Sequence, residues 1–362
     1  MNITRVETIP LALPAVRSRV SLTDPAPPPT AFVAVRLHTD TPHVGLGFTT
    51  TPVGGRALQV LLDSDLAPLM LGEDPAVTER LFAKAQARFR STGWGGLAAR
   101  AYAAMDIACW DLKGKAAGLP LFRLLGGSRP SAACFAGDLA CLGTDAHQTI
   151  KVARPLIEQG VLGVAVDVGS GDVQLDADRV QQIRDGLGES AWLGIAAEGR
   201  YDLGTALAMA HFYEEDVGID WIDTPLPTDD RIGYQRLAER MEVPLAAGSS
   251  FDDRDDFRRV LEAGAVRVLR PDPLRLGGIT PLLKVAALAE AFHVAVVPYR
   301  LPEIGVHLAC GLPNVPMAEW GSWLAAAFTE PVVPRNGKLV PTDRPGHGLE
   351  LNGDAVGRYP AP

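Results

Sequence analysis

The chain has 362 residues, of which 47% are hydrophobic and 21% are charged, as is ordinary for a soluble globular protein with room for two domains. Its net charge of −9 argues against nucleic-acid and anionic-membrane partners. The four cysteines show no CxxC spacing, the N-terminus lacks a signal-peptide pattern, and no apolar run is long enough to cross a membrane. We therefore expect a cytoplasmic protein with reduced thiols.

The first part of the chain predicts a small sheet followed by helices. Strand-like patterns occur in three segments, at residues 2–13, 32–38 and 44–50. Residues 17–29 are polar and rich in proline, which predicts a loop, and we expect this loop and residues 50–55 to cover a pocket. Helical periodicity follows in three segments, at residues 55–70, 76–91 and 95–117.

The last of these helices contains the most distinctive stretch of the chain, residues 97–127. It predicts a long alanine-rich helix, a Gly-Leu-Pro stop and a short turn closed by two glycines. Residues at helical spacing should form its buried stripe, namely Leu97, Tyr102, Met105, Cys109 and Leu112. We expect its charged residues, Asp106 and Asp111 among them, on a solvated face, with Asp111 paired to Lys115 four residues on.

From residue 131 onward, short apolar strands alternate with amphipathic helices. The strands are predicted at residues 132–137, 161–168, 191–197, 219–223, 243–247, 265–270, 294–298 and 315–319. Helices lie between them, such as those predicted at 174–187, 203–215 and 278–291. Eight strands in about 190 residues fit a closed parallel barrel better than an open doubly wound sheet, although the spacing alone is compatible with both.

The segment DIAxWDLKGKxxGxPLxxLLGG, residues 106–127, resembles the helix-to-barrel junction of the mandelate racemase/muconate lactonizing enzyme branch of the enolase superfamily. The resemblance covers nearly the whole chain and implies an α/β fold, a modified (β/α)7β TIM-type barrel with an N-terminal α+β capping domain. It implies a cap over residues 1–128, a barrel over 129–328 and a C-terminal tail over 329–362 that returns to the cap. It also implies a small-molecule substrate and a homo-oligomer, either a dimer or an octamer.

In a βα barrel the chemistry lies at the C-terminal ends of the strands, and here these ends depart from the family pattern. The two lysines that usually end the second strand are replaced by Ala165 and Asp167. The positions of the three metal-binding acids hold Ala196, Asp223 and Ser249. The resemblance therefore leaves one metal-binding carboxylate and implies either no cofactor or Mg²⁺.

Three later strand ends supply candidates for acid/base chemistry. Asp272 matches the position of a catalytic Asp or Lys in the family, and Glu319 matches the electrophilic acid of the racemase group. Tyr299 stands where that group has a histidine. We expect Asp272 and Glu319 to be the principal acid/base residues, with Tyr299 beside them and Asp167 as a further acid. Acids that crowd one another acquire raised pKa values, which suits such a role.

Arginines near the strand ends are candidates for binding an anionic substrate. Arg200, Arg270 and Arg300 could grip a carboxylate bidentately and so replace the metal and the lysines, with Ser249 as a further substrate contact. The same arginines could equally form salt bridges with the acids of the site.

Three interpretations follow. The first is an enzyme that performs proton-transfer chemistry of the racemase, cycloisomerase or dehydratase type on a small anionic molecule without the usual metal. The second is a rearranged metal site, in which Asp167, Glu198 and Asp223 from adjacent strands hold Mg²⁺; period 2 places Glu198 on the same face as Ala196. The third is a non-catalytic ligand-binding or structural descendant of the fold.

Overall fold

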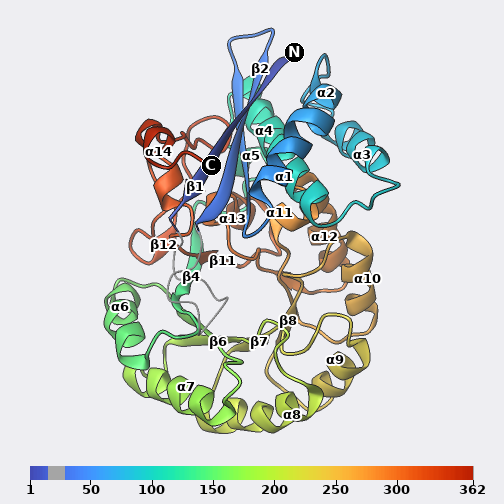
Figure 1. Ribbon diagram of the computed structural model, residues 1–362. Coiled ribbons are helices and arrows are strands. Elements are labelled where there is room, and N and C mark those ends of the chain that lie inside the picture. The colour runs from blue at the N-terminus through green and yellow to red at the C-terminus, as the bar shows by residue number, and fades with distance from the viewer. Residues whose placement is uncertain (15–28, 362) are drawn as a thin grey trace.

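The computed structural model describes residues 1–14 and 29–361. A cap of strands and helices covers one end of a ring of parallel strands and surrounding helices (Figure 1). The predicted fold class, a modified TIM-type barrel with an α+β cap, is confirmed. Except for Pro29, the predicted loop at 17–29 lies outside the described residues.

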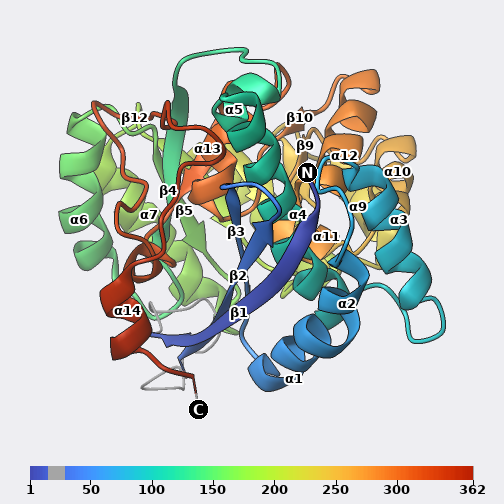
Figure 2. The same ribbon diagram turned by 90° about the horizontal axis from the view of Figure 1, so that it is seen from above.

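The cap is an antiparallel sheet packed against helices. Its strands are β1 (Ile3–Leu13), β2 (Thr30–Thr39) and β3 (Val44–Thr51), paired in the order β1-β2-β3. Its helical segments are α1 (Gly55–Val60), the π-helical Leu61–Leu66, α2 (Ala67–Met70), α3 (Thr78–Arg88), α4 (Leu97–Ala117) and α5 (Leu121–Leu124). Helix α4 crosses the sheet closely (Figure 2) because Gly47 of β3 has no side chain; a Cβ there would collide with the Ala104 carbonyl oxygen.

Helix α4 is buried more completely than its charges suggest. Four residues of its predicted apolar stripe are buried and Leu97 is half-buried, and Asp111 pairs with Lys115 at 2.6 Å as predicted. The predicted solvated face is wrong, because Asp106 and Asp111 are both fully buried. Asp106 accepts hydrogen bonds from the backbone N–H (2.9 Å) and the hydroxyl (2.6 Å) of Thr280 in the barrel, and burial raises its pKa to about 7. These carboxylates bind polar groups of neighbouring segments instead of water.

The barrel contains all eight predicted strands. They are β4 (Ala132–Ala140), β5 (Gly163–Asp167), β6 (Trp192–Ala196), β7 (Trp221–Asp223), β8 (Leu245–Ala247), β9 (Val268–Leu269), β10 (Ala295–Val296) and β11 (Met317–Trp320). They pair in parallel and in chain order from β4 to β10, and β4 also pairs with β11. The Val296 N–H of β10 also donates to the Asn314 carbonyl just before β11 at 2.9 Å, so the two ends of the strand series meet. This is the arrangement of a barrel and not of an open doubly wound sheet.

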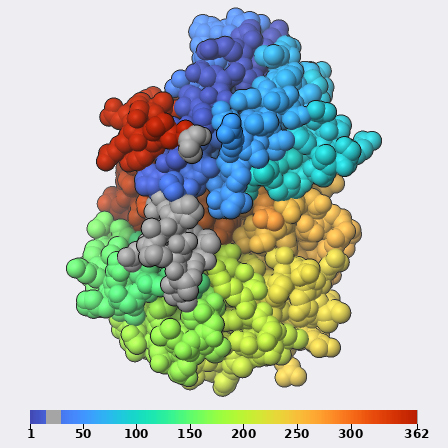
Figure 3. All heavy atoms as spheres, viewed as in Figure 1, coloured from blue at the N-terminus to red at the C-terminus, as the bar shows by residue number. Residues whose placement is uncertain are grey.

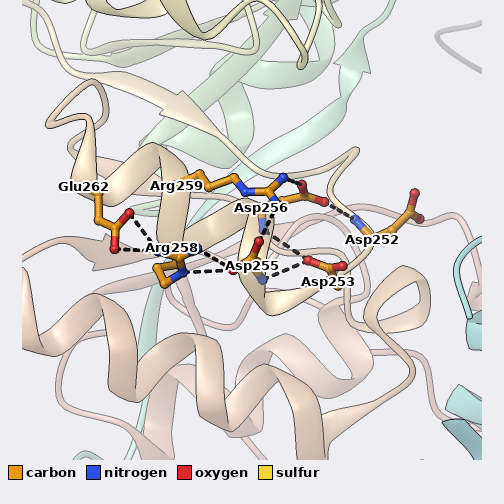
Figure 4. A network of polar contacts seen from close by, with 7 residues as sticks. All are labelled: Asp252, Asp253, Asp255, Asp256, Arg258, Arg259 and Glu262. Atoms are coloured by element: carbon orange, nitrogen blue, oxygen red, sulfur yellow. Dashed lines mark hydrogen bonds and ion pairs between the residues drawn. The ribbon is translucent and has the colours of Figure 1, made fainter. Parts of the chain in front are cut away.

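Helices cover the outside of the barrel (Figure 1). They are α6 (Ala146–Glu158), α7 (Val173–Leu187), α8 (Leu203–His211) with its π-helical extension Phe212–Val217, α9 (Arg231–Ala238), α10 (Arg254–Glu262), α12 (Ile279–Ala291) and α13 (Pro302–Gly311). The short α11 (Pro273–Leu276) instead contacts α4 of the cap. Helices α6 to α10 each begin at an aspartate whose side chain accepts a backbone N–H, a strong helix start signal. At α10 this cap belongs to a polar network at the surface (Figure 4).

The C-terminal segment contacts both parts of the molecule. It contains a short 3₁₀ turn (Ala325–Ala327), strand β12 (Lys338–Leu339) paired with β4, and helix α14 (Gly353–Arg358). The backbone N–H of Ala12 in β1 donates to the Tyr359 carbonyl at 2.9 Å, so the end of the chain lies beside the cap sheet (Figure 2). The domain boundaries, the oligomeric state and the cellular location stay predictions.

All four cysteines are buried, and the structure shows no disulfide between any two of them. In the described parts of the chain, every helix is too short or too polar to cross a membrane.

Candidate active site

A cavity of about 320 Å³ lies at the C-terminal ends of the barrel strands, beneath the cap. The cap contributes Thr30, Thr50, Pro52 and Arg100 to its walls, and the remaining lining comes from the loops that follow the strands. Figure 3 shows the cap, in blue, resting on the green-to-orange barrel. The cavity therefore depends on both parts of the molecule.

Charged side chains give the cavity an excess of positive charge. Among the residues that the structure describes, four arginines line it, Arg100, Arg200, Arg275 and Arg300, against two acids, Glu198 and Asp272. Guanidinium groups bind carboxylates with charge-assisted, often bidentate hydrogen bonds. The lining therefore suits a small organic anion.

Asp272 is held in the cavity wall from two sides. It is the N-cap of α11, where its Oδ1 accepts the Leu274 backbone N–H at 2.8 Å. Its Oδ2 accepts a hydrogen bond from Arg100 of α4 at 3.0 Å. Its side chain is 12% exposed, so a ligand in the cavity can reach it.

Tyr299 and Glu198 form a second polar pair in the wall. The Tyr299 hydroxyl donates to Glu198 Oε1 at 2.9 Å. The Arg300 guanidinium lies 5.2 Å from the Tyr299 ring and 5.1 Å from the Trp323 ring. Glu198 and Arg300 both have positive φ values, 52° and 53°, which non-glycine residues adopt at a cost. The backbone is thus strained where these two side chains line the cavity.

A buried ion triad lies inside the barrel. Arg270, which follows β9, donates through Nε to Asp223 at 3.0 Å and through Nη2 to Glu319. The Arg270 side chain is 1% exposed, and its guanidinium lies 5.1 Å from the Trp221 ring and 5.5 Å from the Phe135 ring. The aromatic floor of the barrel and two carboxylates therefore enclose this cation.

The acids of the triad depend on neighbouring groups. Glu319 also accepts the backbone N–H of Arg300 at 3.0 Å, which ties the triad to the cavity wall. Gly137 makes room for Glu319, since a Cβ there would collide with its carboxylate. Burial raises the pKa of Asp223; Arg270 opposes this shift, and the charge of Glu198 adds to it.

The predicted site residues separate into two sets. Those that line the cavity are Glu198, Arg200, Ser249, Asp272, Tyr299 and Arg300. Those buried behind its lining are Asp167, Asp223, Arg270 and Glu319. The sequence left open whether Arg270 binds a substrate carboxylate or forms salt bridges with acids of the site. The structure shows the salt bridges.

Two arginines of the cavity were missed by the sequence analysis. Arg100 is the only charged residue in LAARAYAAM, the apolar beginning of α4, and that isolation is a signal that could have identified it. Arg275 follows Asp272 by one helical turn and pairs with Asp252 at 2.9 Å. Its local sequence shows no feature that separates it from an ordinary surface arginine.

The donor set at the strand ends does not fit a divalent metal ion. Of the three positions that the family resemblance assigns to metal ligands, only Asp223 is a carboxylate, beside Ala196 and Ser249. Its two oxygens accept hydrogen bonds from the Thr224 hydroxyl at 2.8 Å and from Arg270 at 3.0 Å. Mg²⁺ requires oxygen donors in a near-octahedral arrangement, and the neighbouring guanidinium carries charge of the same sign as the ion.

The alternative metal set does not assemble either. Across residues 1–14 and 29–361, no three or more Asp, Glu, His or Cys side chains are grouped so that they could hold an ion. Asp167, Glu198 and Asp223 therefore do not form the rearranged site that the sequence left open. Glu198 lies with Tyr299 in the cavity wall, whereas Asp223 lies with Arg270 inside the barrel.

Comparison with known proteins gives matches along most of the chain. Residues 5–126 match the model of the mandelate racemase/muconate lactonizing enzyme N-terminal domain, and residues 148–355 match that of the enolase C-terminal domain-like family. The L-talarate/galactarate dehydratase of Salmonella typhimurium is 31% identical over 350 residues, 96% of this chain and 87% of that protein. The 3,6-anhydro-α-L-galactonate cycloisomerase of Streptomyces coelicolor is 32% identical, over 90% of this chain and 91% of that protein.

A similar solved structure is that of L-talarate dehydratase from Polaromonas sp. JS666, complexed with Mg and L-glucarate. It superimposes with a TM-score of 0.90 at 33% identity, over 99% of this chain and 98% of that chain. The likeness thus extends over the cap, the barrel and the C-terminal segment.

Proposed function

The chain belongs to the mandelate racemase/muconate lactonizing enzyme family of the enolase superfamily, and on that premise we propose that it is a dehydratase or cycloisomerase of sugar acids. The observation that carries this proposal is the arginine-rich cavity at the strand ends. A sugar acid is a small anion with many hydroxyl groups, which suits a cavity that mixes arginines with hydroxyl and carboxylate side chains. The names of the two relatives above, a dehydratase and a cycloisomerase of such acids, support the same class.

The substrate carboxylate binds to arginines of the cavity wall. We assign this role to Arg300 and Arg200, with the Ser249 hydroxyl as a further contact, because all three line the cavity. The Ser249 hydroxyl is buried and has no hydrogen-bond partner within the described residues, so a substrate oxygen would satisfy it. These contacts orient the α-carbon of the acid and attract the charge that develops on its carboxylate.

Asp272 is the group that we assign to remove the α-proton. The C–H bond breaks, the proton passes to an Asp272 oxygen, and the electron pair moves into the substrate carboxylate to give an enediolate. Arg300 stabilises that negative charge electrostatically. Positioned proton transfer of this kind contributes roughly 10²–10⁴-fold in rate.

The Tyr299–Glu198 pair then supplies a proton to the leaving group. In a dehydration the bond from the β-carbon to its hydroxyl breaks, and the hydroxyl leaves as water with this proton. The enol that remains tautomerises to a 2-keto acid. In a cycloisomerisation the leaving oxygen belongs to the same molecule, so a ring opens or closes without loss of water.

Two acids from the sequence analysis have no direct part in this scheme. Glu319 is fully buried and bonds to the backbone of Arg300, so we assign it the positioning of that arginine. Asp167 is buried at the end of β5, and its backbone carbonyl accepts a hydrogen bond from Arg179. We give Asp167 no catalytic role.

A panel of aldonates and aldarates in ²H₂O tests the proposal. Loss of the α-proton signal by ¹H NMR reports proton abstraction, and semicarbazide reports a 2-keto acid. For at least one sugar acid we expect both loss of the α-proton signal and formation of a 2-keto acid. We expect neither with Asp272→Asn. Thermal stabilisation by a sugar acid without exchange or product would contradict an enzyme and support the non-catalytic interpretation.

A further inference from the structure

We propose that this chain works without a divalent metal ion: Arg270 pairs with Asp223, the one carboxylate at the positions that the family resemblance assigns to metal ligands, and with Glu319, and Arg300 meets the substrate carboxylate in place of the ion. The inference deepens the proposed function and rests on it for the identity of the substrate. The Polaromonas dehydratase structure contains Mg, whereas residues 1–14 and 29–361 of this chain include no suitable set of donors.

Arg270 is held in place by three acceptors. Its guanidinium bridges Asp223, through Nε at 3.0 Å, and Glu319, through Nη2. Its Nη1 donates to the Val297 carbonyl at 3.1 Å. Because its donors are directed at three acceptors and 1% of its side chain is exposed, an ion that displaced Arg270 would break all three contacts.

The charges of the triad disfavour an ion at Asp223. One guanidinium between two carboxylates leaves a net charge of −1, and each acid already has a cationic partner. A divalent ion at Asp223 would lie next to the guanidinium inside the barrel, where little water screens their repulsion. Removal of Arg270 would leave two buried acids without compensation, which is the more costly state.

Glu319 connects the triad to the substrate-binding wall of the cavity. Glu319 accepts hydrogen bonds from both Arg270 and the Arg300 backbone N–H, the latter at 3.0 Å. The Arg300 side chain lines the cavity between the rings of Tyr299 and Trp323. Arg270 is thus a positioning residue that acts through Glu319, and Arg300 is the cation that faces the ligand.

Titration of the purified, EDTA-treated protein with Mg²⁺ and with Mn²⁺ tests the inference directly. We expect no saturable heat of binding at millimolar metal and no shift in the unfolding temperature. Stoichiometric binding of either ion would overturn the inference. The metal titration needs no substrate, so it tests the inference even if the protein turns over no sugar acid.

Variants test whether Arg270 is the reason. Arg270→Met should gain stability from Mg²⁺ that the wild type does not gain, because the ion can then compensate Asp223 and Glu319. An Arg270→Met variant that folds but gains no stability from Mg²⁺ would contradict the assignment of Arg270. Should this variant not fold, Arg300→Met provides a second test. Its KM for a sugar acid that the enzyme turns over should rise at least tenfold, equally in Mg²⁺ and in EDTA. Restoration of the wild-type KM by Mg²⁺ would overturn the inference.

The failures of the two proposals are distinguishable. Stoichiometric Mg²⁺ together with sugar-acid turnover would leave the proposed function intact and remove this inference. Absence of turnover in EDTA and in Mg²⁺, with no metal bound, would remove the proposed function and leave the metal-free site. Equal kcat in EDTA and in Mg²⁺ would support both.

Discussion

Arg100 of the cap helix and Asp272 of the barrel form an ion pair of 3.0 Å between Nη2 and Oδ2, although 172 positions separate them in the chain. The pair lies in the cavity wall, with side chains that are 18% and 12% exposed. One Asp272 oxygen is fixed by its own helix and the other by the cap. The orientation of the proposed base therefore depends on correct docking of cap and barrel.

Asp272→Asn should lower kcat by roughly 10²–10⁴-fold, because the amide cannot accept the α-proton while its oxygen can still cap α11. Steady-state kinetics with a sugar acid found in the panel checks this. Asp230→Asn is the matched control, since Asp230 caps α9 in the same way, at 2.9 Å from the Gly233 N–H, and lies outside the cavity lining. Equal rates for the wild type and Asp272→Asn would remove Asp272 from the mechanism.

Arg300→Met should raise KM for a sugar acid by about 10–100-fold, since a hydrogen bond to a charged group contributes roughly 1.5–3 kcal/mol. The control is Arg258→Met. Arg258 pairs with Asp255 and Glu262 on exposed α10 (Figure 4), and exposed pairs of this kind contribute little to stability. An unchanged KM in Arg300→Met would place the carboxylate elsewhere in the cavity.

Tyr299→Phe removes the hydroxyl that donates to Glu198 and should lower kcat for elimination by about 10²-fold or more, in line with general acid catalysis. If the two residues act as one proton donor, Tyr299→Phe with Glu198→Gln should cost little more than either change alone. A double-mutant cycle on kcat measures this coupling. Additive losses would show that the two side chains act independently.

The sequence predicted the barrel well because its strands are short apolar runs bounded by glycine and proline. It overestimates the lengths of all but the first: the strand predicted at 265–270 pairs only over Val268–Leu269, since the apolar pattern continues beyond the backbone ladder, whereas the strand predicted at 132–137 extends over Ala132–Ala140. Short elements such as α11 and α14 have too few residues to show a helical period. Asp106 and Asp111 were assigned to solvent because their buried donors come from distant segments.

The site was less predictable because its contacts are tertiary. Resemblance to the family located Asp272 and Tyr299 at strand ends, where both do line the cavity. The sequence could not decide whether Arg270 faces a substrate or an acid, since both choices have the same local sequence. Arg100 belongs to the cavity only because α4 docks on the barrel, which no local pattern encodes.

Glu303, in the first turn of α13, gives a prediction for pH dependence. Its side chain is buried, its Oε2 has no hydrogen-bond partner among the residues described, and burial raises its pKa to about 7 from the ordinary 4.5. Between these values the folded protein retains a proton that the unfolded chain loses. The stability contributed by this group is therefore fully present below the ordinary pKa of 4.5. It falls as the pH rises, and it is lost above the folded-state pKa of about 7.

Glu303→Gln removes the ionisable group, so the variant should match the wild type at about pH 4 and exceed it at about pH 8 by up to roughly 3 kcal/mol. Urea unfolding across this range measures the gap. Glu290→Gln on α12 is the control, because Glu290 is exposed and should leave the pH profile unchanged. A gap between Glu303→Gln and the wild type that stays constant with pH would mean that Glu303 does not titrate in the folded protein within this range, and that its burial has no part in how the protein responds to pH.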